Sequence, residues 1–541
     1  MARMGTKSVS KQNIRLVNDK PLLYYIINTA KKLKHTDIFV STDSDEIKEI
    51  AQLYGVHVIK RPRELSRDTT PAEKIAYHAI SHLNERGMHY EKCLLASPHF
   101  PLINLNSIKK FFSLLNSDIR TIFGYERQEA TTYCRVIGKA NSRITKLIPI
   151  RDYMVKRKKI ISFYCQDLLM TCGFTKPEYG IQLEEDEIFY PENYHHFGIL
   201  EKILDRKRIL VRLHGSRLIG LGHVYNMLTI LNQFRNEDIL VMMDKKNSLG
   251  LKKLKENLYN VKTFANQREF FKTIDNFKPN IIFNDILNTK INYIKKLKKQ
   301  NIFVVNFEDL GSGRKYADLV FNPIFESKDR FPNEFYGSNY ACVRDEFRIF
   351  ERKQIRKSIE KIVITLGGTD YNNNTCKILE TIRNSKTLKK ITIDIILGLG
   401  FVHKTELNSL ISIMKKDGYK INVIRKAELM SKHMIDADFV VTSNGRTVFE
   451  AASLKLPIIA LSVNSREKQH DFVRESKVGF HIDFIKNTAS DELLSCIEKM
   501  FHYTTRKRFI ANLEKIDLRR GTDRVIKIIL EEYDKRSVKS F

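Results

Sequence analysis

The sequence lacks the patterns that mark secreted, disulfide-rich or membrane-spanning proteins. Its seven cysteines are scattered among 541 residues and no Cys-x-x-Cys pair occurs, which excludes a zinc knuckle or a disulfide framework and favours a reduced, cytoplasmic compartment. No stretch approaches the roughly 18 consecutive apolar residues of a membrane span. The first residues, "MARMGTKSVSKQN", are basic without an apolar run behind them, unlike a secretory signal. We therefore expect no stable membrane insertion.

Acidic residues are scarce relative to basic ones. The chain has 93 Lys and Arg against 63 Asp and Glu, a net charge of +30. Such a charge can attract nucleic acid, an acidic membrane or a phosphate-bearing substrate. The lysines in stretches such as "YIKKLKKQN" lie beside periodic apolar residues, as on the solvated face of a helix. Because no basic motif is interleaved with aromatic residues, we predict no nucleic-acid partner.

Apolar strand-like runs alternate with amphipathic helix-like stretches from end to end. "RILVRLHGS", "DILVMMD", "NIIFND", "KIVITLGGTD" and "ADFVVTSNG" are each followed by a helical pattern. This alternation predicts an α/β protein with parallel sheets covered by helices. A charged linker near residue 205 and the segment "FPNEFYGSNYACVRDEF" divide it into domains 1–204, 205–345 and 346–541. Each of the last two has the size of a Rossmann-like domain.

The stretch "RLIGLGHVYNM" places a histidine between a glycine loop and a helix, directly after a strand. Gly220 and Gly222 permit close backbone approach, and a helix N-terminus offers free N–H groups to phosphate. His223 would face the cleft at the strand ends, where an imidazole can take a proton from water or a hydroxyl. Alternatively, the histidine caps its own helix and the glycines serve only the turn.

Two more strand–glycine–helix junctions follow. In the first, Gly367 and Gly368 precede Thr369 and Asp370, which are placed to cap a helix. In the second junction, a pyrophosphate could lie against Gly445, Arg446 and Thr447.

Glu450, one helical turn after this last junction, allows two interpretations. Its carboxylate can accept both hydroxyls of a ribose. "TVFE" is equally a capping box in which Thr447 and Glu450 close the helix start reciprocally.

The order of these motifs resembles a known family. Strand–GxGH–helix, "NFED", "NYACVRDEF", "LGGTD", "SNGRTVFEAASLKLP" and "NSREKQHD", over about residues 208–500, are similar to the nucleotide-sugar hydrolases of pseudaminic acid biosynthesis, relatives of MurG-type glycosyltransferases with a GT-B fold. The resemblance implies a UDP-sugar between two Rossmann-like halves, with no metal or other cofactor. It implies that His223 activates water at the anomeric carbon, releasing UDP and a free 2,4-diacetamido-trideoxy sugar. It also implies that Glu450 binds the ribose and that Gln469 lies near the sugar.

This region departs from the family at two points. His214 stands where the family has an acid, and Asn226 stands where it usually has a basic residue. The lost charges indicate a different sugar or a weakened site.

The first residues carry a small-residue loop with closely spaced basic side chains. Lys7 and its neighbours could meet a triphosphate, or could form a disordered basic N-terminus. "DKPLLYYII", "IFVSTDSDEIKEIAQLYGVHV" and "RPRELSRDTTP" follow, and with the loop they resemble the acylneuraminate cytidylyltransferases over residues 2–80. The resemblance implies Mg²⁺-assisted transfer of CMP from CTP to a nonulosonic acid, and leaves open a homodimer through this domain. The CTP-binding residues that it implies are Arg3, Gly5, Lys7 and Asn13, and those on the sugar-acid side are Arg61 and Asp68.

This domain departs further from its family. Gln12 replaces a lysine, "SPHFPLI" replaces "QPTSPLR", and the late pair of metal-binding aspartates aligns with Glu192 and His196, a poor donor set for Mg²⁺. The loop also lacks a preceding strand to anchor it. We therefore expect a domain that is impaired or serves binding.

Three functions remain open. The leading one is a nonulosonic acid biosynthesis enzyme, with a nucleotidyltransferase-like Rossmann-type domain followed by a GT-B unit acting as a UDP-sugar hydrolase. The second is a GT-B glycosyltransferase of surface polysaccharide assembly, which passes the sugar to an acceptor. The third is a non-catalytic nucleotide-sugar-binding scaffold.

Overall fold

The computed structural model divides the chain into two compact units, residues 1–205 and 206–541. It describes residues 9–34, 36–67, 69–90, 92–114, 121–127, 133–137, 146–150, 155–156, 161–165, 178–182, 186–325, 330–352, 355–383, 385, 387–425, 427, 429–486 and 488–539.

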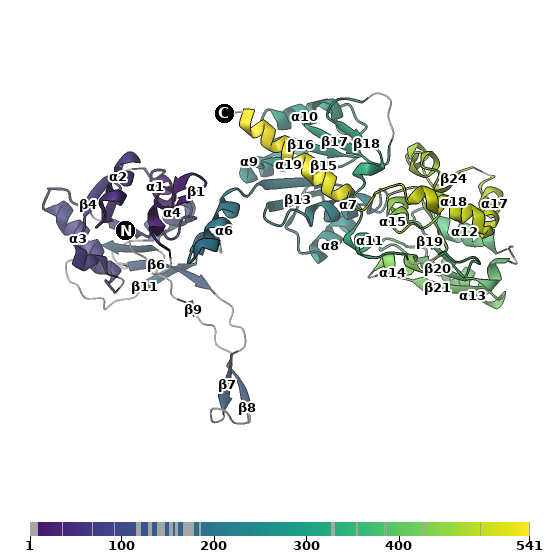
Figure 1. The fold of residues 1–541 in the computed structure, drawn as a ribbon, viewed down its shortest axis with the longest axis horizontal. Helices are drawn as coiled ribbons and strands as arrows, with labels where there is room; N and C mark the ends of the chain where they lie inside the picture. Colours follow the sequence, from purple (N-terminus) through teal and green to yellow (C-terminus); the bar gives the residue numbers. More distant parts are fainter. Residues whose placement is uncertain are drawn as a thin grey trace. The chain divides into compact units, whose positions relative to one another are not determined.

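The first unit combines a mixed sheet with short helices (Figure 1). In its main sheet the order is β11-β6-β10-β5, where β10 runs antiparallel to both neighbours and β11 is parallel to β6, while β9 pairs with β6. Three further pairs, β1–β2, β3–β4 and β7–β8, stand apart from that sheet in the described residues. Ser44 caps helix α2 by accepting the N–H of Ile47, and Asn193 caps α6 in the same way.

The elements of this unit are β1 (Leu16–Val17), β2 (Lys20–Pro21), α1 (Leu22–Ala30), β3 (Phe39–Thr42), α2 (Asp45–Leu53), β4 (His57–Lys60), α3 (Ala72–Asn84), β5 (Lys92–Ala96), α4 (Leu105–Leu114), β6 (Thr121–Arg127), β7 (Tyr133–Ile137), β8 (Lys146–Ile150), β9 (Val155–Lys156), β10 (Ile161–Cys165), β11 (Glu178–Gln182) and α6 (Tyr194–Leu204).

The second unit begins with a half built on a fully parallel seven-stranded sheet of order β14-β13-β12-β15-β16-β17-β18. The direction of winding reverses between β12 and β15, as in a Rossmann fold. Its elements are β12 (Arg208–Leu213), α7 (Gly222–Leu231), β13 (Asp238–Asp244), α8 (Ser248–Glu256), β14 (Val261–Phe264), α9 (Gln267–Phe277), β15 (Ile281–Asp285), α10 (Ile291–Lys298), β16 (Phe303–Phe307), β17 (Leu319–Asn322) and β18 (Glu334–Tyr336).

The other half repeats this plan with six parallel strands in the order β21-β20-β19-β22-β23-β24. Here the winding reverses between β19 and β22. Its elements are α11 (Asp345–Ile349), β19 (Lys361–Thr365), α12 (Asn374–Ile382), β20 (Thr392–Ile396), α13 (Lys404–Lys416), β21 (Lys420–Ile424), α14 (Met430–Ile435), β22 (Phe439–Ser443), α15 (Thr447–Ser453), β23 (Ile458–Ser462), α16 (Phe472–Glu475), β24 (Gly479–Asp483), α17 (Ala489–Phe501), α18 (Tyr503–Leu513) and α19 (Gly521–Lys539).

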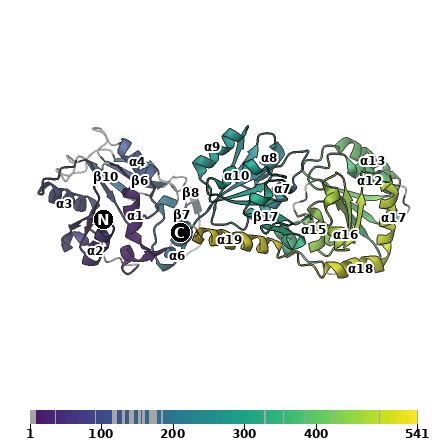
Figure 2. The ribbon, with the colours of Figure 1, turned by 90° about the horizontal axis from the view of Figure 1, so that it is seen from above.

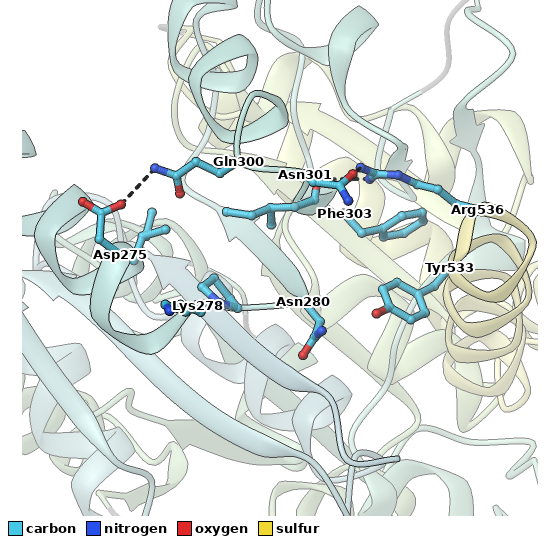
Figure 3. A pocket seen from close by; sticks show the side chains of 11 residues that line it. Asp275, Lys278, Asn280, Gln300, Asn301, Phe303, Tyr533 and Arg536 are labelled. Atoms are coloured by element: carbon cyan, nitrogen blue, oxygen red, sulfur yellow. Dashed lines mark hydrogen bonds between the residues drawn. The ribbon is translucent and has the colours of Figure 1, made fainter. Parts of the chain in front are cut away.

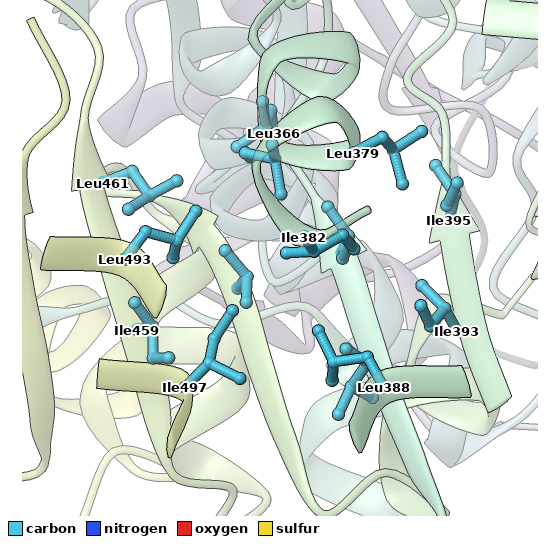
Figure 4. Packing of buried hydrophobic residues seen from close by; sticks show 14 of the residues in the cluster. Leu366, Leu379, Ile382, Leu388, Ile393, Ile395, Ile459, Leu461, Leu493 and Ile497 are labelled. Carbon is cyan, nitrogen blue, oxygen red and sulfur yellow. The ribbon is translucent and has the colours of Figure 1, made fainter. Parts of the chain in front are cut away.

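In the second unit, helices pack against both faces of each sheet, so the strands are buried on two sides and read as continuous apolar runs. Strand β22, for example, is buried at all five positions. Figure 4 shows one of these layers, where isoleucines and leucines of the strands interlock with Leu379 and Ile382 of α12 and with Leu493 and Ile497 of α17. The predicted α/β class is confirmed, with fully parallel sheets in the second unit and a mixed sheet in the first.

The last helix does not stay with the second half. Val525 and Ile529 of α19 are fully buried in the core of the first half, and Figures 1 and 2 show this helix running back along it. The expected domain 346–541 therefore differs from the structure at this helix, because its amphipathic pattern does not say which sheet it covers. No helix among the described residues is long and apolar enough to cross a membrane.

Candidate active site

A cleft of about 1070 Å³ lies between the two halves of the second unit, at the carboxyl ends of their strands. Ligands of open parallel sheets bind at this edge, at the point where the strand order reverses. The residues of the three glycine junctions that line it are Gly220, Gly222, His223, Gly367, Gly368, Thr369, Gly445, Arg446, Thr447 and Glu450. Gln469 is exposed and does not line the cleft, although Glu467 and His470 on either side of it do.

The glycines allow the two halves to approach closely. Gly220 and Gly367 have φ values of +89° and +74°, a region that side chains with a Cβ rarely adopt. A Cβ on Gly368 would lie 2.9 Å from the side chain of Leu221 in the opposite half. A loop from each half thus meets the other at the floor of the cleft.

His223 is the second residue of α7 and is held by a buried carboxylate. Its Nδ1 lies 2.5 Å from Oδ1 of Asp285, the last residue of β15, whose side chain is fully buried. Asn226, one turn along α7, donates its Nδ2–H to the other oxygen of Asp285 over 2.7 Å. A carboxylate at Nδ1 fixes the imidazole orientation and keeps the proton there, so that Nε2 is left to accept one.

The surroundings of His223 and Asp285 favour a protonated imidazole beside an ionised carboxylate. Burial would lower the pKa of His223, but the charge and hydrogen bond of Asp285, with the charge of Glu308, outweigh it and raise that pKa. Burial would raise the pKa of Asp285, but His223, Arg446 and Asn226 together lower it. The neighbouring His214 behaves oppositely: burial, then the charges of His223 and Arg212, lower its pKa to about 4. His223 is therefore the basic imidazole of the cleft, and His214 stays neutral near pH 7.

Arg446 crosses the cleft to the opposite half. Its Nη2 lies 2.8 Å from Oε1 of Glu308, which follows β16, and Oε2 of the same carboxylate lies 4.0 Å from Nδ1 of His223. Glu308 has a φ of +53°. Its backbone carbonyl accepts a hydrogen bond from Arg466 over 2.8 Å, so both halves contribute to its position.

Glu450 is also ion-paired. Nε of Arg344 donates to its Oε1 over 2.7 Å, and Nη1 of Arg344 lies 2.7 Å from Glu346. Helix α15 begins at Thr447 with Arg446 as N-cap and has no side-chain cap hydrogen bond. The capping-box interpretation of Thr447 and Glu450 is therefore not observed, and Glu450 lines the cleft.

At the junction of Gly367 and Gly368, the predicted cap of helix α12 is observed for Asp370, whereas no cap hydrogen bond is seen for Thr369 among the described residues. Asp370 accepts the N–H groups of the first two residues of α12, over 2.8 and 2.9 Å.

In the first unit, two of the implied site residues are buried. Asn13 and Arg61 are 1% and 3% exposed, and Nη2 of Arg61 lies 3.6 Å from Asp43. Gln12, which replaces the family lysine, donates to the carbonyl of Pro191 over 2.8 Å and thus packs as a structural residue. The other implied residues, Arg3, Gly5, Lys7 and Asp68, lie outside the described residues.

Two sets of residues have donor atoms that could ligate a metal ion. The aligned pair in the first unit does not fit Mg²⁺, because Nδ1 of His196 accepts the N–H of Glu192 at the start of α6 and an imidazole is a poor ligand for this ion. In the described residues, one group of three donors lies close enough to share an ion: His223, Asp285 and Glu308. The direct 2.5 Å contact between His223 and Asp285 leaves no space for an ion between them. This group is a hydrogen-bonded pair with a neighbouring carboxylate.

A second cavity, of about 540 Å³, lies at the opposite, amino-terminal edge of the first half's sheet. Figure 3 shows two hydrogen-bonded pairs among its polar side chains, Gln300 with Asp275 and Arg536 with Asn301. Arg536 also contacts the carboxylate of Asp318. The cavity thus lacks the glycine loops and the basic histidine of the cleft.

The sequence interpretation gives no role to three residues: Glu308 and Arg344, which line the cleft, and Asp285, which lies behind His223. The signal for Asp285 and Glu308 was present, since "NIIFND" and "NFED" each place a carboxylate at the end of a strand or directly after it. Carboxyl ends of adjacent parallel strands meet at one edge. Arg344 gives no such signal, because it lies in the connection between the halves.

Comparison with known proteins gives the following relations. A family profile described as cytidylyltransferase matches residues 1–133. Pseudaminic acid cytidylyltransferase of Campylobacter jejuni is 33% identical over 197 residues, covering 36% of this chain and 82% of that protein. An uncharacterised protein of Methanocaldococcus jannaschii, MJ1062, is 29% identical over 354 residues, covering 60% of this chain and 72% of that protein. Other curated cytidylyltransferases are matched over less than half of their own length. Among solved structures, MurG of Acinetobacter baumannii has a TM-score of 0.44 at 12% identity, covering 60% of this chain and 99% of that one.

Proposed function

The chain belongs to the cytidylyltransferase family that includes pseudaminic acid cytidylyltransferase, and from this premise we propose that it is a two-part enzyme of nonulosonic acid biosynthesis. Its second unit hydrolyses a UDP-sugar to UDP and a free 2,4-diacetamido-trideoxy sugar. The observation that carries this proposal is that His223, held from behind by Asp285, lines a cleft that also contains Arg446 and Glu450. A basic imidazole, a guanidinium and a carboxylate acceptor are the groups that water activation, diphosphate and ribose respectively require.

In the proposed reaction, Nε2 of His223 takes a proton from water while the water oxygen attacks the anomeric carbon. The bond between that carbon and the diphosphate oxygen breaks, and its electron pair leaves with UDP. The negatively charged Asp285 stabilises the imidazolium that forms, and Arg446 stabilises the charge developing on the diphosphate. The imidazolium then returns its proton to solvent.

UDP release from a panel of UDP-2,4-diacetamido sugars, with wild type and His223→Ala compared, tests this reaction. Release that falls by about 10²–10⁴-fold in the variant, with UDP binding retained, supports the hydrolase. Transfer of the sugar to an added acceptor, without free sugar, would indicate the glycosyltransferase instead. Binding without turnover, unchanged by the substitution, would indicate a scaffold.

For the first unit we propose nucleotide binding with impaired transfer. Gln12, at the position of the family lysine, is engaged with a backbone carbonyl, and the pair at the expected metal position does not suit Mg²⁺. Formation of a CMP-nonulosonate from CTP and pseudaminic or legionaminic acid, assayed with and without Mg²⁺, tests this. Sustained turnover would contradict impairment, whereas CTP binding without turnover would support it.

A further inference from the structure

The cation expected to bind the diphosphate already has an anionic partner within the protein. Arg446 and Glu308 come from different halves of the second unit, and their charged groups approach to 2.8 Å. The side chain of Glu308 is 7% exposed and that of Arg446 is 14% exposed. A guanidinium binds a carboxylate and a phosphate group in the same way, through a negative charge shared by two acceptor oxygens. Glu308 therefore lies where it competes with a phosphate for Arg446.

This ion pair is close but poorly aligned. Neither Oε1 of Glu308 nor Nη2 of Arg446 has a hydrogen-bond partner within the described part of the chain. Well-aligned Arg–carboxylate pairs are bidentate and strong, and a buried polar atom without a hydrogen bond is costly. A diphosphate that offers aligned acceptor oxygens can thus exchange for Glu308 at a modest cost.

Glu308 also lies close to His223, so release of its carboxylate from Arg446 affects the imidazole. Its second oxygen lies 4.0 Å from Nδ1 of His223, while its backbone is tied to Arg466. Once Arg446 turns to another anion, the carboxylate of Glu308 is left beside the imidazole of His223. A negative charge there stabilises the imidazolium that forms as His223 takes a proton.

We propose that Glu308 is a positioning residue that exchanges with the diphosphate of the ligand. It holds Arg446 until a nucleoside diphosphate takes its place, and it then supports the protonated form of His223. The inference rests on the proposed function for its catalytic part, whereas the competition for Arg446 is a property of binding alone.

Glu308→Gln separates the competition for Arg446 from the support of protonated His223, because glutamine keeps the size of the side chain and removes its charge. We expect UDP to bind this variant more tightly than wild type, by about tenfold if the ion pair is formed about nine-tenths of the time in its absence. Uridine, which carries no phosphate, should bind both proteins equally. UDP-sugar turnover should fall by about tenfold or more. A merely structural role would weaken binding and turnover together.

Glu334→Gln is the matched control. Glu334 lies in the same half, its side chain is fully buried and it is paired with Arg314 at 2.8 Å, but it does not line the cleft. We expect it to leave UDP affinity unchanged. Calorimetric titration of the full chain with UDP and with uridine measures each constant.

UDP binding by Glu308→Gln that is equal to or weaker than wild type overturns the inference, as does an equal gain for uridine. If Glu308→Gln binds UDP more tightly but wild type turns over no UDP-sugar, the exchange is supported and the hydrolase is contradicted. Failure of both proteins to bind UDP overturns both proposals.

Discussion

Asp285→Asn tests whether the buried carboxylate sets the tautomer of His223. Asp285 has hydrogen-bond partners on both oxygens, His223 at 2.5 Å and Asn226 at 2.7 Å. Because Asn226 donates its N–H, the oxygen of the new amide must stay on that side, and the amide NH₂ then faces Nδ1. Nδ1 becomes an acceptor, so the proton moves to Nε2. The imidazole can then no longer take a proton from water.

The expected loss in turnover is large. A positioned general base contributes about 10²–10⁴-fold, and loss of the negative charge beside a forming imidazolium acts on the same step. We expect kcat for UDP release to fall within that range. UDP affinity should stay within about twofold, since Asp285 lies behind His223 and does not line the cleft.

Steady-state assays with a UDP-sugar that wild type hydrolyses measure kcat, and calorimetry with UDP measures binding. Asp318→Asn is a suitable control, because Asp318 also accepts from cationic side chains, Lys298 and Arg536, but lies outside the cleft lining. A variant at Asp285 that keeps kcat within threefold of wild type would refute this role of the carboxylate.

Further predictions concern the frame of the cleft and its pH dependence. Gly398→Ala should abolish UDP binding, measured by calorimetry, and lower the melting temperature, because the new Cβ would lie 2.2 Å from the backbone oxygen of Gly367. An unchanged affinity and melting temperature would contradict this close approach. Arg344→Lys should raise KM for a UDP-sugar about tenfold with little change in kcat, since one ammonium cannot hold both Glu450 and Glu346 as the guanidinium does; an unchanged KM would argue against this orienting role. The kcat/KM of wild type should fall as pH drops through a value above 6.5, because the pKa of His223 is raised and the protonated imidazole is not a base; an acid limb below pH 6 would contradict it.

Much of the fold could be read from local patterns. Alternating apolar runs and amphipathic stretches predict parallel sheets because strands buried on both faces must be apolar throughout. Glycines after a strand mark backbone with a positive φ or a close approach: Gly220 and Gly367 have a positive φ, and Gly368 approaches Leu221 of the opposite half. The same local logic fails for α19, whose apolar face does not specify a partner, and the structure packs it on the first half.

For the candidate site, the sequence by itself determined the residue types and the edge of the sheet at which they lie. His223, Arg446 and Glu450 each stand at a strand–loop–helix junction, and every such junction of a parallel sheet opens at the carboxyl edge. Tertiary structure alone decided which charges meet. Asp285 lies 62 residues from His223, and Glu308 reaches Arg446 from the opposite half. These contacts depend on strand order and on the closing of two halves over each other, neither of which local sequence records.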